Sequence, residues 1–438
     1  MFFGKRKNPV LKNSIVYMTA DAFTRGISFL LLPIVSKYLL PEELGIAANF
    51  DVLQSILALL AGMATVNAIS YFFYKNPKEK IARLVSSLVL IIIVASMAFS
   101  LVIFMTAGYI QNYLHIGIAL QLLAVVSTIA LLVSDISKLL YRLEEKPYKF
   151  AALQLGQSIL YIILQLFMVV HLEMQALGRI YSLVFSLLAF SILHIALLYK
   201  RGYLIWKFDT TSIKELLHFG LPLLPHSLSF WLKSGMDKIL LTAYCGLAVN
   251  GLYSMAMSFG AIYSICEISF IKAYSPYLQK RISQFTPLNT GQEKILLVKQ
   301  AYGFGALFII LYFVVMGICW LGIRYMVDVK YLPCFEFIPW ILLSGTLHIF
   351  YSLTIEYIYT AKKTIGLGII TFIGSVIQLL LTYVLLRYLG KDGIKISMVV
   401  GSAIIMAGVW WYSNKVYPMP WFVTLKGNLW KKDIHIGA

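Results

Sequence analysis

Five charged residues stand out because they lie within apolar stretches and not between them. Asp21 and Arg25 are one helical turn apart in the segment TADAFTRGISFLLLP, and Lys233 and Asp237 have the same spacing, with Lys238 directly after them. A cation at the centre of a membrane helix costs about 2.5–3.5 kcal/mol on insertion scales. Such side chains are therefore expected to face a partner or a cavity, and cations in a low-dielectric cavity are suited to hold an anion.

Two interpretations of these charges stay open at this point. Each pair has the i, i+4 spacing at which an acid and a base neutralise one another on a helix. Both pairs also lie on the first apolar segment of their half of the chain, the positions that a parallel repeat brings together around a central site. Lys238 adds a cation that has no obvious partner on its own helix.

Other polar residues within apolar segments give weaker signals. Four residues of the second segment are candidates to line a cavity, although packing between helices explains them equally well: Asn49, Asp51, Gln54 and Asn67. Glu267 and Glu356 are expected to pair locally with the lysines that follow them.

The composition fixes the class of protein that must position these residues. Of 438 residues, 60% are hydrophobic and 13% are charged, which is far more apolar than a soluble protein requires. The formal charge of +18 is spread in small basic groups between apolar runs, so the pattern indicates lipid contact and not nucleic-acid binding. We therefore expect an all-α polytopic membrane protein.

The chain contains about twelve apolar runs long enough to cross a bilayer. They lie near residues 13–36, 46–73, 84–109, 117–140, 150–171, 177–199, 217–243, 247–271, 300–323, 335–360, 364–387 and 394–414. The segment between the sixth and seventh runs alternates apolar and charged residues, as a helix on a membrane surface does. The predicted organisation is a six-helix lobe over 1–199, an interfacial cytoplasmic linker over 200–216, and a second six-helix lobe with a short cytoplasmic tail over 217–438.

The distribution of basic residues predicts the orientation. With twelve spans, 27 of the 37 Lys and Arg residues fall on the side of the two termini and seven on the opposite side. The positive-inside rule then places both termini in the cytoplasm.

A weak internal repeat relates the two halves. Aligned on a shared glycine, LLPEELGIAANFDVL (39–53) and CGLAVNGLYSMAMSF (245–259) both lie between the first and second spans of their halves. Six helices return the chain to its starting side, so the copies are expected to be related by an axis along the membrane normal.

Several chemistries lack their motifs. The sequence contains no GxxxxGK[ST] phosphate loop and no HExxH metal motif, and its seven histidines are scattered. The loops predicted outside the membrane are about a dozen residues or fewer, which is too short for an external catalytic domain. We therefore expect no catalytic residue, no metal site and no cofactor beyond coupling to H⁺ or Na⁺, and transport in place of catalysis.

Two motifs carry a resemblance to a known family. FGLPLLPHSLSFWLKSGMDKILLTAYCGLAVNGLYSMAMSF, residues 219–259, resembles the seventh-helix signature of Wzx-type polysaccharide flippases. Its matching residues are Pro222, Pro225, Asp237, Lys238, Gly246, Gly251, Tyr253 and Ser254. RGISFLLLPIVSKYLLPEELGI, residues 25–46, is similar to the first-helix pattern of that family. Its matching residues are Pro33, Lys37, Leu39, Pro41, Glu42, Glu43 and Gly45, with departures at Lys37, where arginine is usual, and Leu40, where glycine is usual.

The resemblance implies a member of the multidrug/oligosaccharidyl-lipid/polysaccharide (MOP) superfamily, in which two six-helix lobes form a V that opens alternately to either side of the bacterial cytoplasmic membrane. Its substrates would be undecaprenyl-diphosphate-linked oligosaccharides for O-antigen, capsule or exopolysaccharide, and a polymerase and a chain-length regulator are candidate partners beside the membrane lipids. Arg25, Lys233 and Lys238 are then expected to contact the diphosphate. Asp21 and Asp237 are expected to orient these cations or to take part in ion coupling.

Two alternative functions remain. A drug or cation antiporter of the same superfamily would share the fold, but its deep sites should centre on carboxylates without adjacent cations. A membrane polymerase or ligase of the same pathway would be supported by a large external loop, and none is predicted.

Overall fold

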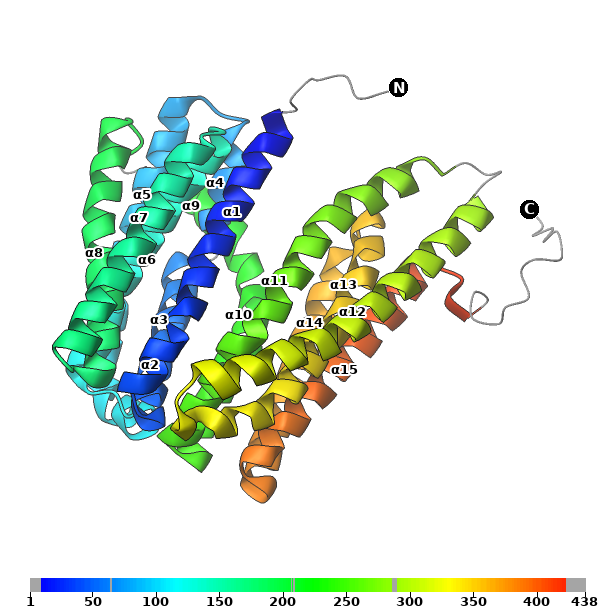
Figure 1. Ribbon diagram of the computed structural model, residues 1–438. Coiled ribbons are helices and arrows are strands. Elements are labelled where there is room, and N and C mark those ends of the chain that lie inside the picture. Colours follow the sequence, from blue (N-terminus) through cyan, green and yellow to red (C-terminus); the bar gives the residue numbers. More distant parts are fainter. Residues whose placement is uncertain (1–8, 64, 206, 208, 286–289, 423–438) are drawn as a thin grey trace. The chain divides into compact units, whose positions relative to one another are not determined.

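The chain is helical throughout the part that the structure describes. The computed structural model describes residues 9–63, 65–205, 207, 209–285 and 290–422, and contains no strand within them (Figure 1). The helices of the first half are α1 (Pro9–Leu30), α2 (Leu32–Tyr38), α3 (Pro41–Gly62), α4 (Val66–Phe73), α5 (Lys78–Leu114), α6 (Ile118–Leu143), α7 (Pro147–Gln165), η1 (Leu166–His171) and α8 (Gln175–Lys200). The remaining helices are α9 (Thr210–Gly220), η2 (Leu221–Leu223), α10 (Leu224–Cys245), α11 (Leu247–Ser283), α12 (Thr290–Met326), η3 (Val329–Phe337), α13 (Ile338–Thr360), α14 (Thr364–Leu389) and α15 (Lys391–Val416).

Ten helical segments of the described chain are long and apolar enough to cross a membrane. The other two predicted spans correspond to α1 with α2, and to α10. Helices α1 and α10 each have 22 residues, but their charged and polar residues lower their mean hydropathy. The fold class predicted from the sequence, an all-α polytopic membrane protein, is confirmed, and crossing by these two helices stays a prediction.

Prolines of the two family motifs lie where the charged helices are interrupted. Helix α1 ends at Leu30 and α2 begins at Leu32, with Pro33 in its first turn. Pro222 lies in the short 3-10 segment η2, and Pro225 lies in the first turn of α10. Proline lacks the backbone N–H that a helix interior requires, so each break falls at the position where this donor is missing.

The chain divides into two compact units. The first contains residues up to Met255, together with Ile323–Cys334 and Leu386–Lys391. The second contains Ala256–Gly322, Phe335–Leu385 and the chain from Asp392 onward. The first unit therefore includes α9 and α10, which the sequence analysis assigned to a linker and to the second lobe, so the division into lobes at residues 200–216 stays a prediction.

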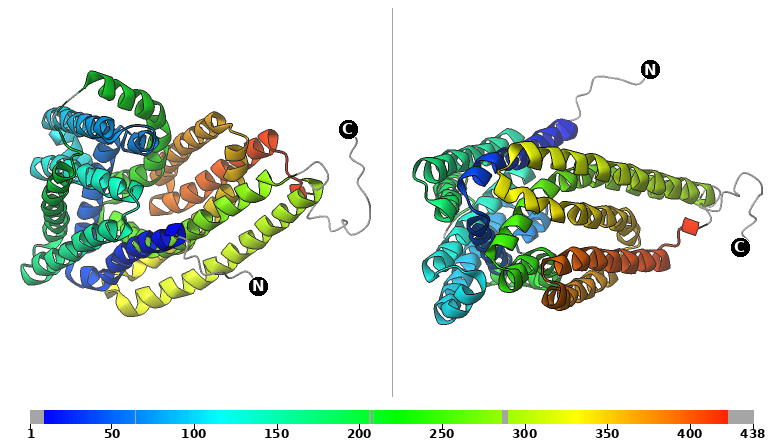
Figure 2. Two further views of the ribbon diagram at one scale, coloured as in Figure 1. Left: turned by 90° about the horizontal axis from the view of Figure 1, so that it is seen from above. Right: turned by 60° about the horizontal axis from the view of Figure 1, so that its bottom comes forward.

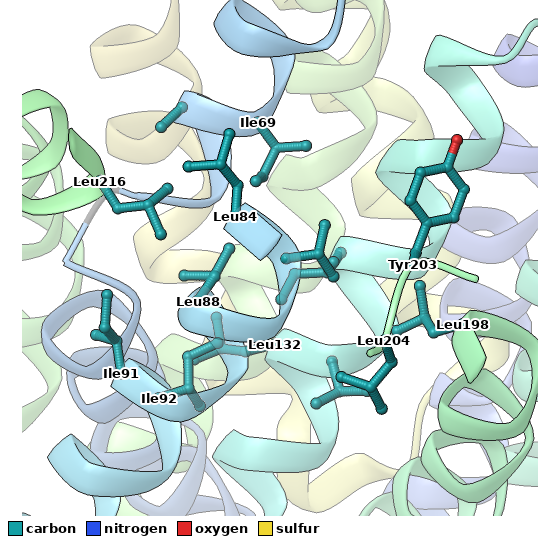
Figure 3. Close-up of a cluster of buried hydrophobic side chains, with 14 of the residues drawn as sticks. Ile69, Leu84, Leu88, Ile91, Ile92, Leu132, Leu198, Tyr203, Leu204 and Leu216 are labelled. Carbon is teal, nitrogen blue, oxygen red and sulfur yellow. The ribbon is translucent and has the colours of Figure 1, made fainter. Parts of the chain in front are cut away.

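The core of the first unit joins segments that are far apart in the sequence. Buried aliphatic residues of α5 such as Leu84 and Leu88 pack with Leu132 of α6 and Leu198 of α8 (Figure 3). Leu216 of α9 is fully buried in the same cluster. The Oδ1 atom of Asp209 accepts a hydrogen bond from the Thr211 amide at 3.0 Å and caps the start of α9. The amphipathic linker is therefore a short helix docked on the first unit.

The second unit consists of α13 and the larger parts of α11, α12, α14 and α15, coloured green to red in Figures 1 and 2. One of its cores joins Tyr274 and Leu278 of α11 to Leu353 and Tyr357 of α13. Helices α11 and α13 thus share an extended contact, along which several polar residues also lie.

Candidate functional site

A buried amide network fixes α10 against α3 in the first unit. Asn49 Oδ1 accepts hydrogen bonds from Thr242 Oγ1 at 3.1 Å and from Asn250 Nδ2 at 2.8 Å. Asn49 Nδ2 donates to the Leu114 carbonyl at 2.8 Å. Because polar groups buried in an apolar interior are costly without partners, this network holds the two helices in one register. It lies two residues from Asp51 on α3 and four from Lys238 on α10.

Two motif glycines bring the starts of α3 and α11 into close contact. A Cβ atom on Gly45 would overlap the carbonyl group of Leu247, and a Cβ atom on Gly251 would overlap the carbonyl group of Pro41. Pro41 and Leu247 each stand four residues before the glycine of their own segment. The contact is therefore reciprocal, as a local two-fold relation between the two aligned segments predicts, and only glycine permits this approach.

A cluster of charged residues lies beside these contacts. The guanidinium nitrogen Nη2 of Arg179, on α8, is 3.7 Å from Asp51 Oδ2, on α3. Lys238 on α10 interacts electrostatically with both residues, and the Tyr161 hydroxyl of α7 lies beside Arg179. Four helices of the first unit thus place two cations, one carboxylate and one phenol together.

The cluster lies within the bundle but remains partly open. At 1.5 Å per residue, Arg179 is about 6 Å from the start of α8, Lys238 about 10 Å from the end of α10, and Asp51 about 15 Å from the start of α3. These three helix ends face the same side, so the cluster lies a few turns in from it. The side chains of Arg179 and Asp51 are 25% and 41% exposed, so a ligand can reach both.

The cluster has the chemistry of an anion site. Two cations and one carboxylate leave one net positive charge, in an environment where water screens charges poorly. An arginine can hold a phosphate through two parallel hydrogen bonds, while a lysine acts as a point charge. The arrangement suits a phosphate-bearing ligand better than a cation.

The predicted first-helix pair is only partly described. Asp21 Oδ1 accepts a hydrogen bond from Gln154 Nε2 of α7 at 2.9 Å. The same amide group donates to Thr24 Oγ1 at 3.3 Å, and Ser158 also donates to Thr24 at 3.3 Å. The side chain of Arg25 lies outside the described residues. Asp21 therefore has a partner on α7, and its pairing with Arg25 stays a prediction.

The other predicted residues differ in their surroundings. On α10, Asp237 is buried, while Lys233 and Lys238 are partly buried. Their roles in binding and orientation stay predictions. Trp231, on the same helix, donates from Nε1 to Ser55 Oγ of α3 at 3.0 Å, a further contact that holds α10 in place.

Of the four candidate cavity-lining residues, Asn49 and Gln54 are buried in helix packing. Gln54 Nε2 donates to Ser127 Oγ at 2.7 Å, and Asn49 Nδ2 donates to the Leu114 carbonyl. These contacts support the packing interpretation, and a role of the two residues in lining a cavity stays a prediction. Asn67 is exposed on α4, and Asp51 alone of the four belongs to the charged cluster.

The sequence analysis missed two members of the cluster. Arg179 is one of the seven basic residues assigned to the side opposite the termini, because it stands only two residues into its apolar run, yet α8 begins four residues before it. Tyr161 carries no charge that would mark it within an apolar segment. The available signal for Arg179 was that it is the single cation between Lys149 and Lys200.

Comparisons with known proteins agree with this fold. Residues 10–281 match the family model described as "Polysaccharide biosynthesis protein". A protein of the Lsg locus of Haemophilus influenzae is 22% identical over 93% of this chain and 98% of its own length. A multidrug resistance MATE family transporter of the MOP superfamily, solved in an inward-facing conformation, superposes with a TM-score of 0.71 at 15% identity, covering 92% of this chain and 96% of its own. A MOP superfamily transporter from Pyrococcus furiosus has a TM-score of 0.56 at 16% identity, covering 94% and 96%.

The fold is thus that of the multi-pass MOP transporters, and the resemblance predicted from the two motifs is confirmed. Because the family model covers more than half of the sequence, this chain belongs to the polysaccharide biosynthesis protein family. Family and fold together support a flippase or transporter.

Proposed function

We propose that this protein is a flippase that moves polyprenyl-diphosphate-linked oligosaccharides across the cytoplasmic membrane of a bacterium, by alternating access. The observation that carries the proposal is the pairing of Arg179 and Lys238 around Asp51 inside the first unit. A diphosphate must cross an apolar barrier with its negative charges, and two cations offset part of that cost. Arg25, Lys233 and the two aspartates one turn from them, Asp21 and Asp237, are proposed to extend this site along α1 and α10.

The charge balance also distinguishes the two transporter classes. A drug-cation antiporter needs deep carboxylates that its cationic substrate can neutralise. In this chain the carboxylate of the cluster already has Arg179 as its partner, which leaves an excess of positive charge. The Pyrococcus furiosus relative is described as having a binding pocket of reverse polarity that suggests a different function. A pocket selective for anions in the present chain would likewise have the polarity opposite to that of a pocket for cationic drugs.

The proposed orientation places both termini in the cytoplasm. It rests on the excess of Lys and Arg on one side of the predicted spans, and it places the loop between α7 and α8 outside. The charged cluster would then lie in the outer half of the first unit. A polymerase and a chain-length regulator remain proposed partners, because the product would be released at the outer surface where chains are extended.

The proposal is tested by transfer in proteoliposomes. The purified chain is reconstituted with a fluorescent polyprenyl-diphosphate oligosaccharide, and the fraction accessible to an external quencher is followed with time. Transfer well above that in protein-free liposomes is expected. Efflux of a cationic dye driven by an ion gradient in the same liposomes, without transfer of the lipid, would instead show an antiporter.

A further inference from the structure

The second unit contains a buried acid–base pair that is separate from the charged cluster of the first. The Oε1 atom of Glu267, on α11, is hydrogen-bonded to His348 Nδ1, on α13. Ser352 Oγ donates to the same carboxylate oxygen at 3.4 Å. His348 lies about 15 Å from the start of α13 and about 18 Å from its end, so the pair is far from both ends of that helix.

The two members of the pair differ in how deeply they are buried in the unit. The Glu267 side chain is 8% exposed and the His348 side chain is 40% exposed. The imidazole therefore connects a buried carboxylate with the surface of the unit. Histidine is the side chain whose ordinary titration falls closest to neutral pH, and it can pass a proton between its two ring nitrogens.

The pairing differs from the one that the sequence suggested. Glu267 was expected to pair with a lysine of the next turn, but within the described residues its partners are His348 and Ser352. Glu356 likewise accepts a hydrogen bond from Gln279 Nε2 at 3.2 Å and does not pair with the lysines that follow it. No lysine or arginine of the described chain is ion-paired with Glu267, so His348 is its ion-pairing partner there.

Several titratable groups lie around the pair. Tyr263 on α11 interacts electrostatically with Glu267 and Cys266, the Tyr351 ring lies against His348 on α13, and Glu356 lies two turns further along α13. Helix α12 faces this region with the Phe308 carbonyl, which accepts from Tyr263. Helix α15 contributes Ser402, which is hydrogen-bonded to Ser344.

We propose that Glu267 and His348 form the proton-binding site of the second unit and couple proton movement to transport. This inference rests on the proposed alternating-access function. One proton is taken from water at the exposed imidazole and passes to the Glu267 carboxylate, which leaves a neutral pair. Release reverses these steps, so the pair changes its net charge by one. A charge change in a poorly screened interior favours one packing of α11 against α13 over another.

The first test measures the protonation of Glu267 directly. Infrared difference spectra of the full-length chain in nanodiscs are recorded as the pH is changed between about 5 and 8, the range in which histidine pairs titrate. The carbonyl stretching band of a protonated carboxylic acid should appear as the pH falls. It should be lost in Glu267→Gln, shifted in His348→Gln, and retained in Glu356→Gln, which alters the other buried carboxylate of the same two helices.

Three results would overturn the proposal. One is a titrating band that Glu267→Gln leaves intact, and another is the absence of any carboxyl band in the wild-type chain over this range. The third is a band that responds to added Na⁺ at constant pH and not to pH, which would make the pair a sodium site. The last two results are read from the wild-type spectra alone. The proposal can therefore be refuted even if a variant fails to fold.

A second measurement separates this inference from the proposed function. Transfer of the fluorescent diphosphate lipid is measured with and without an imposed pH gradient, and the ratio of the two rates should fall toward unity in Glu267→Gln. An unchanged ratio in that variant would refute the coupling role while leaving the flippase intact. If the wild-type chain moves no lipid at all, the flippase proposal fails, whereas the infrared result still stands as evidence on the proton site.

Discussion

Among single residues, Asp51 has the least expected role. It is the partner of Arg179 and interacts with Lys238, so it competes with an incoming anion for both cations. The carboxylate is therefore expected to stabilise the two cations when the site is empty. It is also expected to weaken the binding of a diphosphate.

Asp51→Asn is therefore expected to tighten the binding of a short-chain prenyl diphosphate by about threefold to tenfold, which corresponds to about 0.7–1.4 kcal/mol. Isothermal titration calorimetry on the detergent-purified chain measures the effect. The matched control is Asp135→Asn, since Asp135 pairs with Lys138 on α6 at 2.9 Å and takes no part in the cluster. Equal or weaker binding by Asp51→Asn would show that the carboxylate does not oppose the anion.

Glu144, directly after α6, predicts how stability depends on pH. Burial acts to raise its pKa, but interactions with Lys146, Arg201 and Tyr203 outweigh burial and hold the pKa below its ordinary value. Lys146 Nζ and the Tyr203 hydroxyl donate to it at 2.7 Å, and Arg201 forms an ion pair with it at 2.6 Å. A carboxyl whose pKa is lowered by folding stabilises the protein above its unfolded-state pKa, and this contribution is lost as the pH falls through the folded-state pKa.

Glu144→Gln should thus lower the free energy of unfolding by about 1–3 kcal/mol at neutral pH, the usual range for hydrogen bonds to charged groups. The difference from the wild-type chain should shrink as the pH is lowered below about 4.5, the ordinary range of glutamate. Thermal unfolding in detergent at several pH values measures it, with the exposed neighbour Glu145→Gln as the control. A difference that stays constant with pH would contradict the ionic origin of the effect.

Sequence reasoning found some of these residues and missed others for one physical reason. A charge within an apolar run is visible from the sequence alone. Lys238 was identified in this way, and Asp51 was identified as a polar residue of the second run. Arg179 stands at the edge of such a run, where a loop residue and a helix residue look alike. A histidine carries no fixed charge that would mark it within an apolar run. The sequence therefore gave no indication that His348 pairs with Glu267 on another helix.

At the level of helices, the crossing of α3 and α11 is the clearest case of sequence dictating structure. The PEExG motif begins α3, and the Leu40 amide donates to Glu43 Oε2 at 2.7 Å in its first turn. The glycine of that motif then meets the glycine of the aligned segment. The internal repeat, weak as a sequence signal, is supported by this reciprocal contact.

Gly251→Ala should destabilise the chain by about 1–3 kcal/mol or more, the range for overpacking, because the added methyl group would overlap backbone atoms that cannot rotate away. The control is Gly303→Ala on α12, where a Cβ atom meets nothing within 4 Å. There the gain in helix propensity should make the change neutral or stabilising. Equal midpoints of thermal unfolding for the two variants would disprove the close crossing.

The amide network makes a second prediction about the helices. Asn49→Leu removes the acceptor of Thr242 and Asn250 and the donor to Leu114, so it should lower the free energy of unfolding by about 1–3 kcal/mol. Asn67→Leu is the matched control, because Asn67 is exposed on α4. If both variants unfold at the same temperature as the wild-type chain, the network does not hold α10 against α3.

The positions of the helices were largely predictable, and their ends were less so. Apolar runs locate α5, α6, α8 and α12 to α15, because a span needs about 20 apolar residues. Helices α5, α11 and α12 each extend to 37 residues, well beyond their apolar runs. The extensions are amphipathic and polar, so hydropathy alone does not reveal them.

For the whole molecule, the family and the fold give a transporter, and the charged cluster suggests what it carries. Sequence motifs covering about 60 residues were sufficient to identify the family, because they encode a proline break, a helix start and a glycine crossing. They could not locate the proposed substrate site, since the charged cluster is assembled from α3, α7, α8 and α10 by tertiary packing.

The central claim is that cations of the first unit carry the diphosphate headgroup. It is tested most directly by comparing transfer of a polyprenyl-diphosphate saccharide with that of the matched polyprenyl saccharide without phosphates. The comparison uses the wild-type chain, Arg179→Ala with Lys238→Ala, and the exposed control Arg324→Ala in proteoliposomes. We predict that the wild-type chain and the control prefer the diphosphate lipid by about tenfold or more and that the double variant loses this preference, since two charged contacts to phosphate are removed. Equal transfer of the two lipids by the wild-type chain, or an unchanged preference in the double variant, would contradict the claim.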